Sequence, residues 1–182
     1  MSVIYENGIG YDVASRLLKE NIIMVNGQVD DFMADDVISK MLLLDHADKG
    51  DIHMYINTGG GSVTAGLAII DTMNLVGCDV NTYCMGMCAS MGACILSQGT
   101  KGKRLALPNS HVMIHQVSAG TSGAVDDMIK TVEFAKSLNG RLASMIAKST
   151  KKTLKRVKAD MDRDYYMNAE EALAYGIIDQ IL

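Results

Sequence analysis

A single serine in an otherwise apolar run is the first residue that could carry out chemistry. Ser90 is the only hydroxyl in "GMCASMGACI" (86–95), and glycines lie on both sides of it. If "DVNTYCM" (79–85) is a strand and "SMGACIL" (90–96) begins a helix, Ser90 lies at the helix N-terminus, where free N–H groups can stabilise an oxyanion. That is the layout of a nucleophile elbow, although the G-x-S-x-G pattern is absent because residue 88 is Cys. A buried small residue or a simple helix N-cap is the alternative.

A serine nucleophile needs a general base, and the base needs an orienting group. His115 lies in the strand-like stretch "VMIHQ" (112–116), an apolar environment that would keep an imidazole neutral and able to accept a proton. A hydrogen-bonded core histidine is the other interpretation. His111 is four residues earlier, but a strand would separate the two residues by about 13 Å, which is too far for a shared metal ion.

The orienting acid is the least determined member of this group. The stretch "DMDRDYYM" (160–167) offers Asp160, Asp162 and Asp164. Of the three, Asp164 directly precedes an aromatic pair that would bury it. Spacing alone does not choose among these carboxylates.

A glycine run, "NTGGGSVTAG" (57–66), is a third candidate for chemistry. It follows an expected strand and opens an expected helix, but it fits neither the Walker A pattern nor G-x-G-x-x-G. Phosphate binding is therefore a weak interpretation. A loop whose glycine backbone approaches a substrate closely and donates N–H groups is one alternative, and a flexible turn is the other.

The elements that must position these residues follow an alternating order. Strand-like runs rich in β-branched or aromatic residues alternate with segments whose apolar residues have helical spacing. A β-α-β-α-β order favours parallel strands with right-handed crossovers, which predicts an α/β fold. The expected strands are 21–27, 51–57, 79–85, 103–107 and 112–116. The expected helices are 33–48, 62–76, about 122–148, 153–161 and 168–176.

The helix expected over about 122–148 is long for a domain of this size. Its apolar stripe can be an internal core element, or it can project and bury its stripe against another subunit. Near the C-terminus, "NAEEALAYG" (168–176) predicts a capped helix, with Asn168 as N-cap, Glu171 at the capping-box position and Gly176 as the stop.

Composition limits the class of protein. With 182 residues and 48% hydrophobic content, the chain can bury a large core, and we expect one domain over residues 1–182. A net charge of -4 from 17 basic and 21 acidic residues gives no electrostatic footprint for nucleic acid. The four cysteines have neither disulfide-framework nor zinc spacing and are expected to be buried. Without a leader-like or membrane-spanning run, we expect a cytoplasmic protein.

Four segments together resemble one known family. "YINTGGGSVTAG", "CASMGA", "KGKRLALPNSHVMIHQ" and "DRDYYMNAEEALAYGIID" occur in this order and are similar to the signatures of the ClpP family, the proteolytic subunits of Clp proteases. The resemblance runs from about Tyr11 to the C-terminus. It implies a crotonase-like (ClpP-type) α/β fold whose subunits form two stacked seven-membered rings. It also implies a handle region at about 116–150 that joins the rings, and an axial N-terminal segment at about 1–18.

The resemblance implies a role for each candidate residue of the site. Ser90 matches the nucleophile, His115 the general base and Asp164 the orienting acid. The backbone N–H groups of Gly61 and Met91 match the oxyanion hole. The implied activity is that of a serine endopeptidase acting on unfolded proteins and peptides inside an oligomeric chamber, with no metal or organic cofactor in this chain.

The resemblance also implies contacts outside the active site. Asp162 and Arg163 match residues that contact the opposite ring. An AAA+ unfoldase of the Clp family would use the ATP and place its loops in an apolar pocket, and neither nucleic acid nor membrane is an expected partner. The residues matching this pocket are His53, Tyr55, Leu75, Tyr83 and Leu105.

The chain also departs from the family pattern. Gly59 and Val117 stand where the family usually has proline, and both changes are expected to loosen the backbone beside the site. His53 replaces a usual Tyr, which would weaken or alter unfoldase docking, and the N-terminal segment is several residues short. Two alternatives stay open: a weak or silent subunit that works only in a mixed ring with a paralogue, and a crotonase-type acyl-CoA enzyme.

Overall fold

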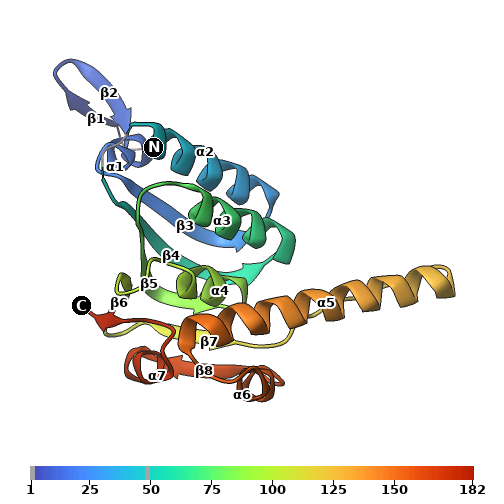
Figure 1. Cartoon of the computed structure of the whole chain (residues 1–182). Coiled ribbons are helices and arrows are strands. Elements are labelled where there is room, and N and C mark those ends of the chain that lie inside the picture. Colours follow the sequence, from blue (N-terminus) through green and yellow to red (C-terminus); the bar gives the residue numbers. More distant parts are fainter. Residues whose placement is uncertain (1–2, 48–49) are drawn as a thin grey trace.

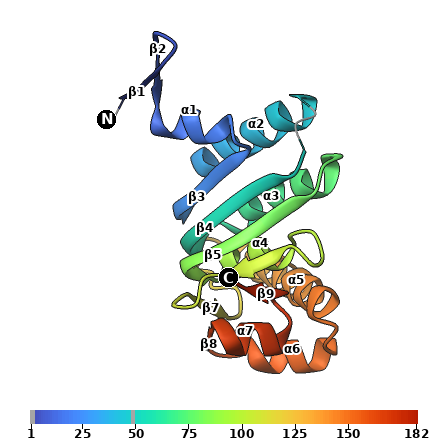
Figure 2. The same ribbon diagram turned by 90° about the vertical axis from the view of Figure 1, so that its left-hand side faces the viewer.

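The computed structural model describes residues 3–47 and 50–182. A parallel sheet forms the centre, and α3 and α4 lie behind it in the view of Figure 2. The first residues of the expected axial segment, and the last residue of the helix expected at 33–48, lie outside the described residues. The strands are β1 (Val3–Glu6), β2 (Ile9–Asp12), β3 (Ile22–Val29), β4 (Ile52–Gly61), β5 (Val80–Ala89), β6 (Arg104–Ala106), β7 (His111–Ile114), β8 (Tyr165–Asn168) and β9 (Gln180–Ile181). The helices are α1 (Val13–Leu18), α2 (Asp31–Ala47), α3 (Val63–Leu75), α4 (Met91–Ser97), α5 (Val125–Thr150), α6 (Leu154–Asp160) and α7 (Ala169–Tyr175).

The sheet confirms the expected α/β class. Its main path runs in the order β3-β4-β5-β6-β9, and every neighbouring pair along it is parallel. One edge of β5 pairs with β4, and the other edge is divided: its first part pairs with β6, and its second part pairs with β7. The antiparallel strand β8 then adds to β7. This fork brings the end of β7, and with it residue 115, beside the end of β5 and residue 90.

Side chains along β4 alternate between the buried face of the sheet and its other face. Ile52, Met54 and Ile56 are fully buried and belong to the core. The intervening His53 and Tyr55 point to the other face and are half-buried. Because side chains alternate with a period of two, one strand supplies both the core and a surface.

The long helix α5 is a core element over one half, as one interpretation expected, and projects from the body over the other. Its buried residues lie in the C-terminal half: Leu142, Ala143, Ile146 and Ala147. The N-terminal half extends away from the body (Figure 1) and exposes Val125, Ile129, Val132 and Phe134. The helix thus packs on the core at one end and presents an uncovered apolar stripe at the other.

Several expectations need correction. The glycine run was expected to be a loop, but β4 continues through Gly61 because it still pairs with β3 there. His115 was expected inside a strand, yet β7 ends at Ile114. The hairpin β1–β2, helix α1 and the short strands β8 and β9 were not predicted. The capping box of Asn168 with Glu171 is confirmed, and Gly176 ends α7 with a positive φ of 94°.

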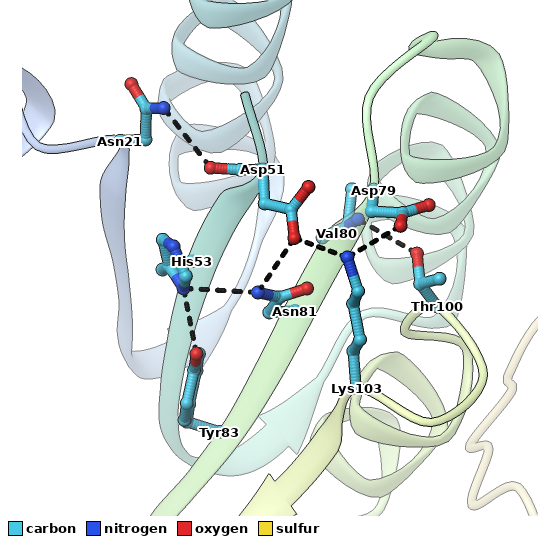
Figure 3. A network of polar contacts seen from close by, with 9 residues as sticks. All are labelled: Asn21, Asp51, His53, Asp79, Val80, Asn81, Tyr83, Thr100 and Lys103. Atoms are coloured by element: carbon cyan, nitrogen blue, oxygen red, sulfur yellow. Dashed lines mark hydrogen bonds and ion pairs between the residues drawn. The ribbon is translucent and has the colours of Figure 1, made fainter. Parts of the chain in front are cut away.

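A network of polar contacts links the N-terminal ends of β4, β5 and β6 (Figure 3). Lys103 contacts the carboxylates of both Asp51 and Asp79, the latter at 2.7 Å. Asn81 continues the network from Asp51 to the ring of His53, at 3.4 and 3.3 Å. These contacts lie at the N-terminal ends of the parallel strands, whereas Ser90 follows the C-terminal end of β5.

Candidate active site

Ser90 occupies a sharp strand-to-helix turn between β5 and α4. Its backbone has φ 55° and ψ −117°, a region that residues other than glycine rarely adopt. Such a conformation costs about 1–3 kcal/mol and persists where the surroundings enforce it. One enforcing contact is the Ser90 N–H, which donates to the carbonyl of Met113 in β7 at 2.8 Å. The geometry is that of the expected nucleophile elbow.

The end of β4 presses against this turn. A Cβ atom on Gly60 would lie 2.7 Å from the Cβ of Ser90 and 3.1 Å from the backbone nitrogen of Met91. Gly60 also has a positive φ of 96°. Only glycine lacks a Cβ that would clash with Ser90 and readily adopts this positive φ, so position 60 requires glycine for both reasons.

His115 lies between Ser90 and a carboxylate. Its Nε2 is 2.8 Å from the Ser90 hydroxyl oxygen, and its Nδ1 is 3.1 Å from Oδ1 of Asp164. The tautomer that satisfies both contacts has Nδ1–H donating to Asp164 and Nε2 accepting from Ser90. The Ser90 hydroxyl is turned to the imidazole and makes no bond as a helix cap. This arrangement excludes the simple N-cap interpretation.

Of the three candidate aspartates, Asp164 is the one that contacts His115. Asp160 is occupied elsewhere, since its Oδ2 accepts from the hydroxyl of Tyr175 and from Arg156. Asp162 is exposed, and its backbone carbonyl accepts from the side chain of Gln116. Asp164 was expected to be buried, but its side chain is 55% exposed in the single chain.

A cavity of about 250 Å³ opens beside the nucleophile. Gly61, Ser90 and His115 line one part of it. Its other walls are largely apolar, so a peptide could place an uncharged side chain there while its carbonyl faces Ser90. The apolar lining residues are Val63, Cys94, Ile114, Val117, Leu142, Ile146 and Met161. Met91, whose N–H is the other expected oxyanion donor, is the first residue of α4 and follows Ser90 directly.

The residues expected to form a docking pocket are only partly brought together. His53, Tyr55 and Tyr83 lie on adjacent strands, where the two tyrosine rings stack at 4.4 Å and the Tyr83 hydroxyl is 2.8 Å from Nδ1 of His53. Leu105 pairs with Tyr83 across β5 and β6. Leu75 is the last residue of α3 and is 74% exposed. Leu75 thus belongs to a helix, whereas the other four residues lie on the strands β4, β5 and β6.

Other expected features have definite places. Asp162 and Arg163 are exposed in the turn before Asp164. Cys84, Cys88 and Cys94 are buried as expected, and Cys78 is half-buried. Burial raises the pKa of the Cys94 thiol to about 12. Within residues 3–47 and 50–182, no cluster of three or more potential metal-ligating side chains occurs and no helix is long and apolar enough to span a membrane.

Sequence reasoning missed three residues that support the site. Gly60 belongs to the glycine run, but three successive glycines give no sign of which one approaches Ser90. The side chain of Gln116 binds the carbonyl of Asp162, and the side chain of Asn139 in α5 accepts the Val117 N–H at 3.0 Å. Both bonds join segments that are distant in sequence, and no local pattern indicates them.

The Ser90 hydroxyl is hydrogen-bonded to the imidazole of His115, and the imidazole contacts the carboxylate of Asp164. This arrangement, on a parallel α/β sheet, is that of a serine peptidase. A sequence model described as Clp protease matches residues 6–182. The chain is 52% identical to ATP-dependent Clp protease proteolytic subunits from Streptococcus pyogenes serotypes M5 (strain Manfredo), M49 (strain NZ131) and M1, over 94% of this chain and 89% of each relative. The chain therefore belongs to the Clp protease family, a family of serine peptidases.

Proposed function

We propose that the chain is a proteolytic subunit of an ATP-dependent Clp protease. It hydrolyses peptide bonds of unfolded proteins and peptides with Ser90 as nucleophile, His115 as general base and Asp164 as orienting acid. The observation that carries this proposal is the continuous contact from Ser90 through His115 to Asp164, at 2.8 and 3.1 Å. The names of the relatives favour this activity over that of an acyl-CoA enzyme.

The reaction follows from the positions of these atoms. As the hydroxyl oxygen of Ser90 attacks the peptide carbonyl, its proton passes to Nε2 of His115. Asp164 stabilises the resulting imidazolium through Nδ1–H. His115 then gives the proton to the leaving amine, which leaves an acyl group on Ser90. Water, activated by the same imidazole, releases the acyl group and restores the hydroxyl.

The oxyanion is assigned to two backbone donors. Met91 supplies the first N–H of α4, a group that has no partner within its own helix. Gly61 lines the same cavity as Ser90, which precedes Met91. Removal of one such donor raises the barrier by about 2.7–4 kcal/mol in serine proteases. Neither donor depends on a side chain, so the oxyanion hole needs no metal or organic cofactor.

The proposed partners use surfaces that a single chain leaves open. A second copy would cover the exposed apolar stripe of α5, so that two seven-membered rings stack through their handle regions, with Asp162 and Arg163 near the junction. An AAA+ unfoldase would dock on the aromatic face around Tyr55 and Tyr83 and supply unfolded polypeptide at the cost of ATP. We place this assembly in the cytoplasm. The hairpin β1–β2 (Figure 1) would stand at the axial entrance.

Intact-mass analysis after treatment with a serine-reactive fluorophosphonate tests this function. The purified full chain should gain one adduct per chain, and Ser90→Ala should gain none. Hydrolysis of a small fluorogenic peptide should be lost in the same variant. An unlabelled wild-type chain would contradict the proposal for the isolated protein. Labelling restored only by adding a paralogous subunit would then support the mixed-ring alternative.

A further inference from the structure

We propose that Asn139 of helix α5 is a positioning residue for the general base. Its side-chain oxygen accepts the backbone N–H of Val117 at 3.0 Å, two residues beyond His115. The proposal rests on the proposed function, because it concerns how the same site is held in shape. Asn139 would act through the backbone, without touching the substrate.

The backbone around His115 needs such support. Strand β7 ends at Ile114, whose ladder partner is Tyr165 of β8. From residue 115 to residue 124 the described chain forms neither helix nor strand. The strand ladder therefore fixes the backbone only up to the residue before His115. Beyond that point, the chain direction depends on individual contacts.

Two side-chain contacts hold this segment, and they lead to different elements. Gln116 donates to the carbonyl of Asp162 at 2.9 Å, which ties the segment to the turn before Asp164. Asn139 ties it to α5 one residue further on. The first contact links the base to the acid. The second links the base to a long helix that is anchored in the core.

Asn139 is well placed to act as this anchor. It is half-buried and lies between the exposed Phe134 and the buried Leu142, where α5 meets the body. Val117 is half-buried as well, packs against the core and lines the cavity beside Ser90. Its N–H is therefore partly screened from water, and an acceptor on α5 favours one backbone position over others.

The hydrogen bond between Val117 and Asn139 also changes how the replacement of the family's proline by Val117 is interpreted. Val117 stands where the resemblance leads one to expect proline, and it was expected to loosen the backbone. A proline has no N–H and could not donate to Asn139. Val117 has this donor, and the structure shows it bound. The chain thus replaces the stiffness of a ring with a hydrogen bond to α5.

Loss of the bond should displace His115 relative to Ser90 and Asp164. Errors of about 1 Å in the placement of a reacting group can cost about 100-fold in rate. Because Asn139 does not line the cavity beside Ser90, the effect should fall mainly on kcat and little on KM. A purely structural role would instead lower thermal stability or disturb assembly.

A pair of variants separates these roles. Asn139→Leu keeps a similar size but removes the acceptor, whereas Asn139→Asp keeps an oxygen for the Val117 N–H. Ser144→Ala is the matched control, since it removes a bond within α5, from the Ser144 hydroxyl to the Gly140 carbonyl. For each assembled full chain, kcat and KM on a small peptide, the rate of fluorophosphonate labelling, the Tm and the sedimentation coefficient are measured.

We expect Asn139→Leu to lower kcat and the labelling rate about 10-fold or more, with KM, Tm and assembly size close to wild type. Asn139→Asp and Ser144→Ala should stay within about threefold of wild type. Val117→Pro removes the donor instead, so Asn139→Leu should add little in that background.

Normal labelling of Asn139→Leu, an Asp variant as slow as the Leu variant, full additivity with Val117→Pro, or a loss explained by disassembly would each overturn the inference. A wild-type chain that is not labelled at Ser90 would instead overturn the proposed function itself, and the inference with it.

Discussion

Gly60 and Ser90 are in such close contact that a methyl group on the glycine would stand 2.7 Å from the Cβ of the serine. The two residues come from the ends of neighbouring parallel strands, β4 and β5. Their contact packs the glycine backbone under the strained turn that presents the hydroxyl. The neighbouring Gly59 is different: a Cβ there would meet no described atom within 4 Å.

This difference predicts opposite outcomes for two similar substitutions. Gly60→Ala should displace the turn, lower peptidase activity at least about 10-fold and cost about 1–3 kcal/mol of stability, because it adds a clash to a positive φ. Gly59→Ala should lower activity far less, although Gly59 lines the cavity beside Ser90, and should add up to about 1 kcal/mol of stability by restricting the unfolded chain. Urea unfolding and fluorogenic-peptide hydrolysis measure both. Equal behaviour of the two variants would contradict the role assigned to Gly60.

Asp164→Asn should retain the fold and lose most of the activity. An amide can hold the imidazole in the wrong tautomer and cannot stabilise the imidazolium, so we expect kcat to fall about 1,000- to 10,000-fold, as in other serine proteases. Glu170→Gln, an exposed change on α7, is the control and should have wild-type kcat. If Asp164→Asn kept more than about a tenth of the kcat, another group would have to orient His115.

Asp179 predicts a stability change in acid. Burial alone would raise the pKa of this carboxyl, but bonds from the Arg104 side chain and from the backbone N–H groups of Arg104 and Gly102 outweigh burial and hold the pKa below the ordinary 3.8. A carboxyl with a lowered pKa stabilises the fold fully above pH 3.8, and this stability is lost as the pH falls through its folded pKa.

Asp179→Asn should therefore cost about 3 kcal/mol near neutral pH, because it leaves the nearly buried Arg104 without its counter-charge. The gap between wild type and variant should shrink as the pH falls below 3.8. Urea midpoints between pH 7 and pH 3 measure this gap. Asp36→Asn, which breaks an exposed helix pair with Lys40, should cost less than about 1 kcal/mol. A gap that does not change with pH would contradict the explanation.

The apolar stripe of α5 predicts how the assembly separates. Ile129 and Val132, which are 52% and 44% exposed, should contact the opposite ring. Replacing both by Asp should prevent ring stacking and about halve the mass seen by sedimentation, because buried, unpaired carboxylates are costly. Lys130→Gln, on a different face of the same helix, should leave the mass unchanged. An unchanged mass for the Asp variant would remove α5 from the proposed interface.

The sequence was sufficient to predict the sheet and the turn that carries Ser90. It was not sufficient to predict the long-range contacts that hold the site residues in place. The alternation of strands and helices predicted the parallel sheet, and the apolar run around Ser90 predicted the turn. Three aspartates within five residues could not be distinguished by spacing, because the choice depends on how the chain leaves α6. The family resemblance pointed to Asp164, and the structure places that carboxylate against His115.

Other elements were missed for physical reasons. Strand β9 spans two residues, which is too short for a period of two to be recognised, and β8 is a strand because it pairs with the distant β7. The contact of Gly60 with Ser90 and the bond between Asn139 and Val117 are long-range, so no window of sequence contains both partners. The glycine run continued as strand because pairing with β3 outweighs the low intrinsic strand preference of glycine.

Helix α5 experiences two environments along one continuous set of backbone hydrogen bonds. Near Ile146 the amides are covered by the core and should exchange with deuterium only when the domain opens widely. Near Ile129 they depend on local fraying for as long as the apolar stripe faces water. Covering that stripe would slow their exchange without altering the core. The rate of amide deuterium exchange in the projecting turns of α5 therefore reports what fraction of the protein is assembled.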